Sequence, residues 1–267
     1  MHGISIEAAA TLRDLRDKIS RMLKIPEKRL VLLHIDKNYG MIEFINDTNM
    51  IQEMFEDFET IYALETPIIT VNEDQLIQTS ELSNNMYQQM LTIIWLNRVG
   101  IGKQGSIFGS LFTAIVSRDS TFCKLQSLIL STMSKYLINH ENMDCVELSR
   151  NINLRLRVVN GLPGKEYLIP ELDHPLFVPT VENALSKTED KRLYRGPYHL
   201  KLMVEWDLDI RRSILINDDL IDAIDKNDMF IDKSVELAKE CSNLNNRTTL
   251  QDCLDIYFRE ESVSNII

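Results

Sequence analysis

The chain has 267 residues, 44% of them hydrophobic and 26% charged, which is typical of a soluble globular protein with one large domain or two smaller ones. Its formal net charge of −11 repels a phosphate backbone and argues against nucleic-acid binding. Since no apolar run of about 18 residues and no leader segment are found, we expect no membrane partner and a cytoplasmic or nuclear location.

The opening segment, residues 4–35, predicts a strand, a capped helix and a second strand. Thr11 and Asp14 have the spacing of a capping box, and Pro26 prevents the helix from continuing. The apolar residues between them recur at three- and four-residue steps, so they share one helix face. They are Leu12, Leu15, Ile19, Met22 and Leu23. After the proline, the Leu- and Val-rich run 29–35 is short enough to be a buried strand.

Residues 36–67 predict the rest of a small sheet. Residues 36–40 form a turn by composition, and short strands are expected at 41–45 and 61–64 with a helical turn between them. A sheet curled over one helix in this order is a β-grasp. We therefore predict an α+β protein that begins with a β-grasp segment at residues 1–67.

The next region begins with two segments that the pattern leaves open. The dense apolar run at 90–96 fits a strand as well as a helix. The sequence GIGKQG at 100–105 lacks the glycine spacing and the Lys-Ser or Lys-Thr ending of a phosphate-binding loop. A flexible loop is the stronger interpretation there.

The pattern is clearer from residue 107 onward. A strand is predicted at 110–116, a helix with an apolar stripe at 122–137 and an alternating strand at 152–159. Arg155 and Arg157 lie on one face of this last strand. An acidic partner would suit them, but exposure to solvent explains them more simply.

The remaining chain contains one strongly patterned strand. Residues 180–194 are polar and predict a mobile connector, whereas 198–206 alternates cleanly between polar and apolar residues and predicts a half-buried strand. Residues 216–244 are acidic and amphipathic. A second capping box at 249–252 starts a final amphipathic helix.

Asp207 and Asp209 follow the alternating strand. Two carboxylates at this spacing suit a cation or acid–base chemistry. A turn neutralised by Arg211 and Arg212 is the more economical interpretation.

No motif for a metalloprotease, a serine nucleophile or a dinucleotide appears in the sequence. The cysteines are widely spaced, form no CxxC pair and are expected to be reduced; they are Cys123, Cys145, Cys241 and Cys253. Folding that brings Cys123 or Cys253 close to His199 is one interpretation, but chance proximity explains such a pair more simply. We predict no catalytic, cofactor-binding or metal-binding residue, and no cofactor.

Four blocks, in order, resemble the ubiquitin-specific proteases, in particular the subgroup with a ubiquitin-like fold inserted in the catalytic domain. The first, TLRDLRDKISRMLKIPEKRLVLLHI with the later IYALE, is similar to that insert. The second, IFGSLFTAIVSRDSTFCKLQSLILSTMSKYL, is similar to the strand and helix that follow it. HLKLMVEWD resembles the strand where the second half of the catalytic domain resumes, and TTLQDCLDIYFREE the helix before the second zinc CxxC.

This resemblance implies a papain-like cysteine deubiquitinase, also named ubiquitin carboxyl-terminal hydrolase, which hydrolyses isopeptide bonds at the ubiquitin C-terminus. Its partners would be ubiquitin or ubiquitinated proteins and the missing parts of the catalytic domain. The family's Gly-Asn-x-Cys box, Gly-His-Tyr box and zinc CxxC pairs are absent, and His199 lies in YHLK. No catalytic or metal residue is therefore carried over.

The resemblance predicts a non-catalytic internal fragment of such an enzyme, without its nucleophile or general base. Residues 1–67 would be the ubiquitin-like β-grasp, 68–195 a strand and helix region with a Pro-rich and polar connector, and 196–267 the start of the second catalytic half. The alternative is a stand-alone ubiquitin-like module that binds a protein partner without chemistry.

Overall fold

The computed structural model describes residues 4, 6–7, 9–36, 40–43, 46–52, 61–68, 90–100, 105–138, 144–152, 154–189, 194–227 and 231–245. The chain divides into two compact units, one of residues 7–227 and one of residues 1–6 with 228–267. The protein is mixed α+β, as predicted. Within the described residues, no helix is long and apolar enough to cross a membrane.

Helix α1 (Leu12–Leu23) begins with the predicted capping box. The Thr11 amide donates to Asp14 Oδ2 at 2.8 Å, and the Asp14 amide donates to Thr11 Oγ1 at 3.3 Å. Hydrogen bonds from the Thr11 amide and hydroxyl hold the pKa of Asp14 below its usual range. The helix ends where Lys24 adopts a left-handed conformation, shortly before Pro26. Met22, expected on the apolar face, is 40% exposed instead.

The first sheet contains three described strands, β1 (Leu30–Asp36), β2 (Gly40–Glu43) and β3 (Tyr62–Glu65), in the order β2-β1-β3. Both pairings are antiparallel. Residues 4, 6 and 7, where a strand was expected before α1, are described and form none. The helical turn expected near 50–58 is visible only at its first residues, because 53–60 lie outside the described part. The complete β-grasp stays a prediction.

The central sheet combines β4 (Met90–Val99), β5 (Ser106–Ser117), β6 (Arg155–Val158) and β7 (His199–Trp206) in the order β5-β4-β7-β6. The two middle strands, β4 and β7, run parallel, and the outer strands are antiparallel to them. The run at 90–96 is thus a strand. Its continuous apolar character follows from burial on both faces.

Helices and short 3-10 turns connect and flank these strands. They are α4 (Phe122–Thr132), η4 (Ser134–Tyr136), α5 (Cys145–Asn151), η6 (Pro175–Phe177), α6 (Pro179–Ser186), α7 (Leu208–Ile214), α8 (Asp218–Asn227) and, in the second unit, α9 (Lys233–Asn245). The helix predicted at 122–137 therefore ends early and continues as η4. The final helix, predicted to start at the capping box 249–252, lies outside the described residues.

Helix α6 corrects the mobile connector predicted from residue 180. Pro179 occupies the first turn, where its missing amide hydrogen costs nothing. Val181, Ala184 and Leu185 are buried in the main core. The polar sequence misled the prediction because only one face of this short helix is apolar.

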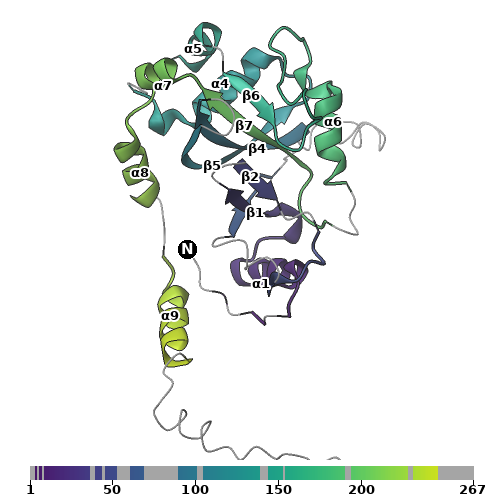
Figure 1. Cartoon of the computed structure of the whole chain (residues 1–267), viewed down its shortest axis with the longest axis vertical. Coiled ribbons are helices and arrows are strands. Elements are labelled where there is room, and N and C mark those ends of the chain that lie inside the picture. The colour runs from purple at the N-terminus through teal and green to yellow at the C-terminus, as the bar shows by residue number, and fades with distance from the viewer. Residues whose placement is uncertain are drawn as a thin grey trace, which may run out of the picture. The chain divides into compact units, whose positions relative to one another are not determined.

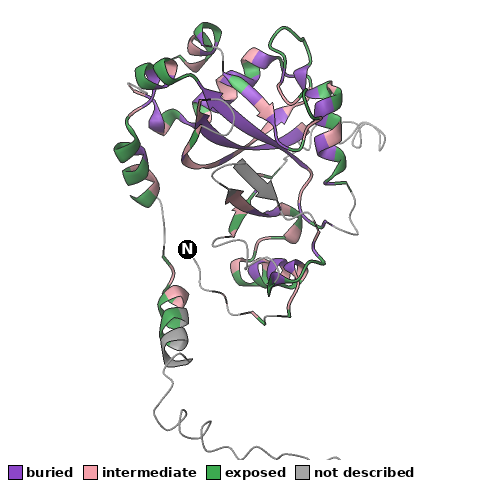
Figure 2. Ribbon diagram, in the orientation of Figure 1, coloured by how far each residue is buried: buried purple, intermediate pink, exposed green. Residues whose placement is uncertain are grey.

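The two faces of the central sheet are covered by different layers (Figure 1). On one face, alternate residues of β4 and β7 pack against helices α4, α6, α7 and α8 in the main core. On the other face, Ile94, Leu96 and Met203 pack against Val31 and Leu33 of β1. Strand β7 is consequently buried along its whole length, and not half-buried as predicted (Figure 2).

Candidate functional site

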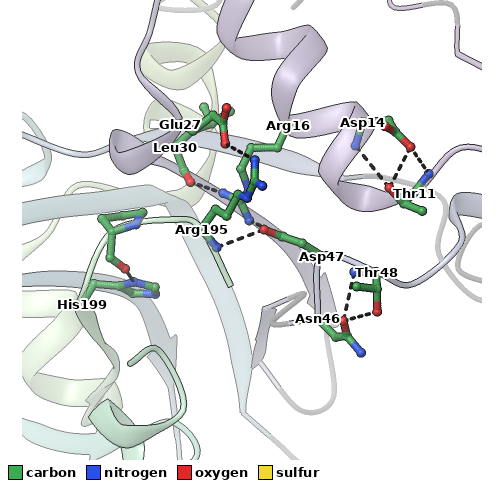
Figure 3. Close-up of polar contacts among 11 residues, drawn as sticks. Thr11, Asp14, Arg16, Glu27, Leu30, Asn46, Asp47, Thr48, Arg195 and His199 are labelled. Carbon is green, nitrogen blue, oxygen red and sulfur yellow. Dashed lines mark hydrogen bonds and ion pairs between the residues drawn. The ribbon is translucent and has the colours of Figure 1, made fainter. Parts of the chain in front are cut away.

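A buried ion pair marks the junction between the first sheet and the central sheet. Arg16 of α1 and Asp47, in the turn after β2, are both fully buried, and Arg16 Nη2 lies 2.9 Å from Asp47 Oδ1 (Figure 3). The other terminal nitrogen of Arg16 donates to the Leu30 carbonyl. Asp47 Oδ2 accepts the backbone amide of Arg195, at 3.0 Å, from the segment before β7. One carboxylate thus links residues that are far apart in the sequence.

Local structure holds both members of this pair in place. Arg16 is four residues after Leu12, so it lies on the buried face of α1. Asn46 Oδ1 accepts the Thr48 amide at 2.9 Å, which fixes the turn that presents Asp47. The Asp47 carbonyl also accepts the amide of Arg13 at 2.9 Å, within the first turn of α1.

Tyr194, before β7, and His199, the first residue of β7, complete the junction. The Arg16 guanidinium lies over the Tyr194 ring, 5.1 Å from its centroid, a favourable cation–π geometry. A Cβ on Gly196 would overlap the Tyr194 hydroxyl, so a glycine is needed there. His199 Nδ1 lies 2.9 Å from the Pro197 carbonyl, and its ring is 6.1 Å from that of Tyr194.

A cavity of about 700 Å³ opens beside this junction. Its lining comes from the short 3-10 turn η1 (Glu27–Arg29) before β1, the segment after β3, the start of β4 and the segment before β7. The lining residues are Lys28, Arg29, Thr66, Pro67, Ile68, Met90, Thr92, Arg195, Gly196, Pro197 and Tyr198. The volume lies within the range of about 300–1,000 Å³ that is usual for ligand sites.

The charges around the cavity are only partly balanced. Arg29 Nη2 lies 2.6 Å from Glu65 Oε1, and Arg195 Nη1 lies 3.6 Å from Glu27 Oε2. Lys28 makes no ion pair with any described residue. Burial and then the neighbouring Asp17 carboxyl raise the pKa of Glu27 above its usual range. The cavity therefore carries more positive than negative charge.

Comparison with known proteins gives relatives of a single kind. Ubiquitin carboxyl-terminal hydrolase 31 of Homo sapiens is 27% identical over 98% of this chain. Ubiquitin carboxyl-terminal hydrolase 43 is 26% identical over 66% of it in Homo sapiens and 22% identical over 96% in Mus musculus. This chain is related to the ubiquitin carboxyl-terminal hydrolases. The relationship confirms the family resemblance that the four sequence blocks predicted.

The match covers only part of each hydrolase. The aligned segment spans 20% of the first relative, and 14% and 22% of the two others. No protein-family profile matches the chain.

The surroundings of two of the four cysteine thiols are described. Cys123 and Cys145 are free and half-buried. Cys123 Sγ lies 3.3 Å from Ser149 Oγ, whereas the ring contacts described for His199 involve Pro197 and Tyr194. Burial, followed by the charge of Asp144, raises the pKa of Cys145, so its thiolate is disfavoured. Cys253 lies outside the described residues.

Asp207 and Asp209 lie at the start of α7. Asp207 is the N-cap of α7 and accepts the amide of Asp209 at 2.8 Å. Arg211, expected to neutralise this turn, pairs with Asp218. Among the described residues, no group of three His, Cys, Asp or Glu side chains is arranged to hold a metal ion.

Arg155 is exposed, as expected, and Arg157 is half-buried, and both also have partners within the protein. Arg157 Nε lies 3.5 Å from Glu205 Oε1, and the Arg155 guanidinium lies over the Tyr167 ring. Tyr167 in turn donates to Glu205 Oε2 at 2.9 Å. Residues 101–104 of the loop predicted at GIGKQG lie outside the described residues.

Little in the sequence indicates the junction. Arg16 was detectable, because a charged residue interrupts the apolar face of α1 at a core position. Asp47 and Arg195 are 148 residues apart and carry no motif. Only the folded sheets bring them together.

Proposed function

We propose that this chain serves in ubiquitin deconjugation as a scaffold segment of a ubiquitin carboxyl-terminal hydrolase. The 27% identity that extends over 98% of the chain carries this proposal, because it covers both sheets and the junction. The partners proposed are ubiquitin or ubiquitinated proteins and the catalytic parts of such an enzyme. We place the protein in the cytoplasm or nucleus.

The thiols support a non-catalytic role for this chain alone. A cysteine protease needs an accessible thiolate activated by a base. Of the two cysteines whose surroundings are described, Cys123 contacts a serine hydroxyl, and Cys145 has a raised pKa. The raised pKa of Cys145 does not favour a thiolate nucleophile.

The order of the first sheet supports the finer assignment of residues 1–67 as ubiquitin-like. A capped helix is followed by β1, β2 and β3, with β3 on the other side of β1 from β2. The stand-alone module is not favoured, because β1 shares a core with β4 and β7 and the buried Asp47 binds the Arg195 amide.

The proposal that the chain alone is not catalytic is tested with a fluorogenic ubiquitin C-terminal substrate. The purified chain should show no turnover above background. A variant with Cys123, Cys145, Cys241 and Cys253 all changed to Ser is the matched control and should behave identically. Turnover by the natural chain that this variant loses would overturn the non-catalytic assignment.

The scaffold role is tested by exchange into a relative. The aligned segment of human ubiquitin carboxyl-terminal hydrolase 31 is replaced by this chain, and in a control by a Gly-Ser linker of equal length. The chimera with this chain should hydrolyse the substrate, and the linker chimera should not. A chimera that melts cooperatively but is inactive, or an active linker chimera, contradicts the proposal.

A further inference from the structure

The cavity beside the junction is lined by two kinds of side chain. Three of its lining residues are cationic, namely Lys28, Arg29 and Arg195. Most of the others are apolar or aromatic, namely Pro67, Ile68, Met90, Pro197 and Tyr198. Ile68 is 59% exposed, although it follows a strand at the edge of the cavity. An exposed isoleucine within a concave, partly apolar surface is typical of a binding site.

The positive charge here is unusual for so acidic a protein. The whole chain carries −11, yet its described cavity has three cations in the lining and no carboxylate. Glu65 and Glu27 each pair with one arginine from outside the lining. Arg29 also donates Nε to the Thr66 carbonyl at 3.1 Å. Arg29 Nη1, Arg195 Nη2 and the Lys28 ammonium then make no bond to the described protein groups.

We infer that this cavity binds an extended peptide segment of a partner protein in which an apolar side chain stands next to a carboxylate. The apolar side chain covers Ile68 and Met90, and the carboxylate lies near Lys28 and Arg195. A lone inorganic anion would leave the apolar side chains uncovered, and a purely apolar ligand would bury unpaired cations. The combination of charge and apolar area selects the peptide chemistry. This inference does not depend on hydrolysis.

The test is fluorescence anisotropy on the intact chain with short labelled peptides. One carries Glu-Leu-Glu within a Gly-Ser sequence, and three comparison peptides carry Lys-Leu-Lys, Glu-Ser-Glu or Gly-Ser alone. The Glu-Leu-Glu peptide should bind most tightly, and its affinity should fall as salt is raised, because the ionic contacts are near the surface. Equal affinity for the lysine peptide would overturn the inference.

Two pairs of variants locate the binding. Lys28→Glu should weaken binding of the Glu-Leu-Glu peptide about fivefold, whereas Lys165→Glu, the same charge change at an exposed turn, should not. Ile68→Ser should weaken it about tenfold, whereas Ile169→Ser, at a position 50% exposed elsewhere, should not. Equal losses in a variant and its control contradict binding in this cavity.

Two further experiments distinguish two other occupants of the cavity. Sedimentation should show a monomer; a dimer abolished by Ile68→Ser means that a second copy fills the cavity. Residues 69–89, which join Ile68 to Met90, lie outside the description. If the peptide binds only after they are replaced by a Gly-Ser linker of equal length, this segment is the occupant. Either result refutes a peptide of a partner protein.

Discussion

The two faces of the central sheet differ in the kind of contact that covers them. On the helical face, Leu202 of β7 lies in a large apolar core. On the opposite face, its neighbour Met203 lies in a small apolar cluster with β1. The first sheet on that side is also tied to the segment before β7 by buried charges, because Asp47 pairs with Arg16 and accepts the Arg195 amide. Apolar burial is non-directional, whereas hydrogen-bonded charges are satisfied in one arrangement only.

This difference suggests separate roles for the two faces. The helical face supplies most of the apolar stabilisation of the unit. The opposite face fixes the position of the first sheet on the central one, and the cavity lies at its edge. Substitutions that remove either the charges or the apolar groups test whether the two faces have separate roles.

The largest effect is expected from Arg16→Leu. It leaves the Asp47 carboxylate buried without its cation, which should lower the free energy of unfolding by about 3–5 kcal/mol. The double variant Arg16→Leu with Asp47→Leu should recover much of this loss, because no charge is then left unpaired. Urea unfolding gives the free energy of unfolding of the natural chain, the single variant and the double variant.

Arg212→Leu is the control for that series, since Arg212 is exposed, and it should change the free energy of unfolding by less than about 0.5 kcal/mol. If Arg16→Leu is no more harmful than Arg212→Leu, the buried pair does not hold the junction.

Substitutions at two adjacent residues compare the faces directly. Leu202→Ala and Met203→Ala should each cost about 3 kcal/mol, because both side chains are fully buried. Their effects on amide hydrogen exchange should differ. Leu202→Ala should speed exchange throughout both sheets, whereas Met203→Ala should act chiefly on β1. Identical exchange patterns would mean that the two faces form one cooperative core.

A smaller effect is expected from Tyr167→Phe. The Tyr167 hydroxyl donates to Glu205, whose side chain is only 1% exposed, so its removal should cost about 1–2 kcal/mol. Tyr198→Phe is the matched control, because no hydrogen bond of the Tyr198 hydroxyl is described, and it should cost less than about 0.5 kcal/mol. Equal values from thermal or urea unfolding would contradict a role for the hydroxyl bond.

Patterns among neighbouring residues predicted much of the fold, whereas contacts between residues far apart in the sequence could not be predicted. The Thr11 and Asp14 capping box, the helix end before Pro26 and the strand at 29–35 follow from neighbouring residues. Strand β7 was found by its alternation, yet its polar face is buried because the first sheet covers it. A period of two shows which residues share a face, and it does not show what covers that face.

The candidate site was even less predictable. Arg195 follows a polar stretch that predicted a mobile connector, but its backbone amide binds Asp47. The cavity lining comes from four separate segments, so no local motif encodes it. Pairings of this kind depend on tertiary packing, which a single sequence does not reveal.

The smallest effect concerns Glu27, beside the junction. Its pKa is raised, first by burial and then by Asp17, so the folded protein holds this proton more tightly than the unfolded chain does. Protonation of Glu27 therefore favours folding. Its contribution is complete below the unfolded pKa of about 4.3 and is lost as the pH rises through the higher folded value.

Glu27→Gln removes this titration, at the cost of a long contact with the half-exposed Arg195. Across that pH interval, the stability of the variant relative to the natural chain should rise and then level off. Urea unfolding at successive pH values measures the difference. Asp17→Asn removes a cause of the raised pKa, so the gain should shrink in that background. A difference that is constant with pH would show that Glu27 titrates alike in the folded and unfolded chains, and the charges at this edge of the junction would then be decoupled from folding.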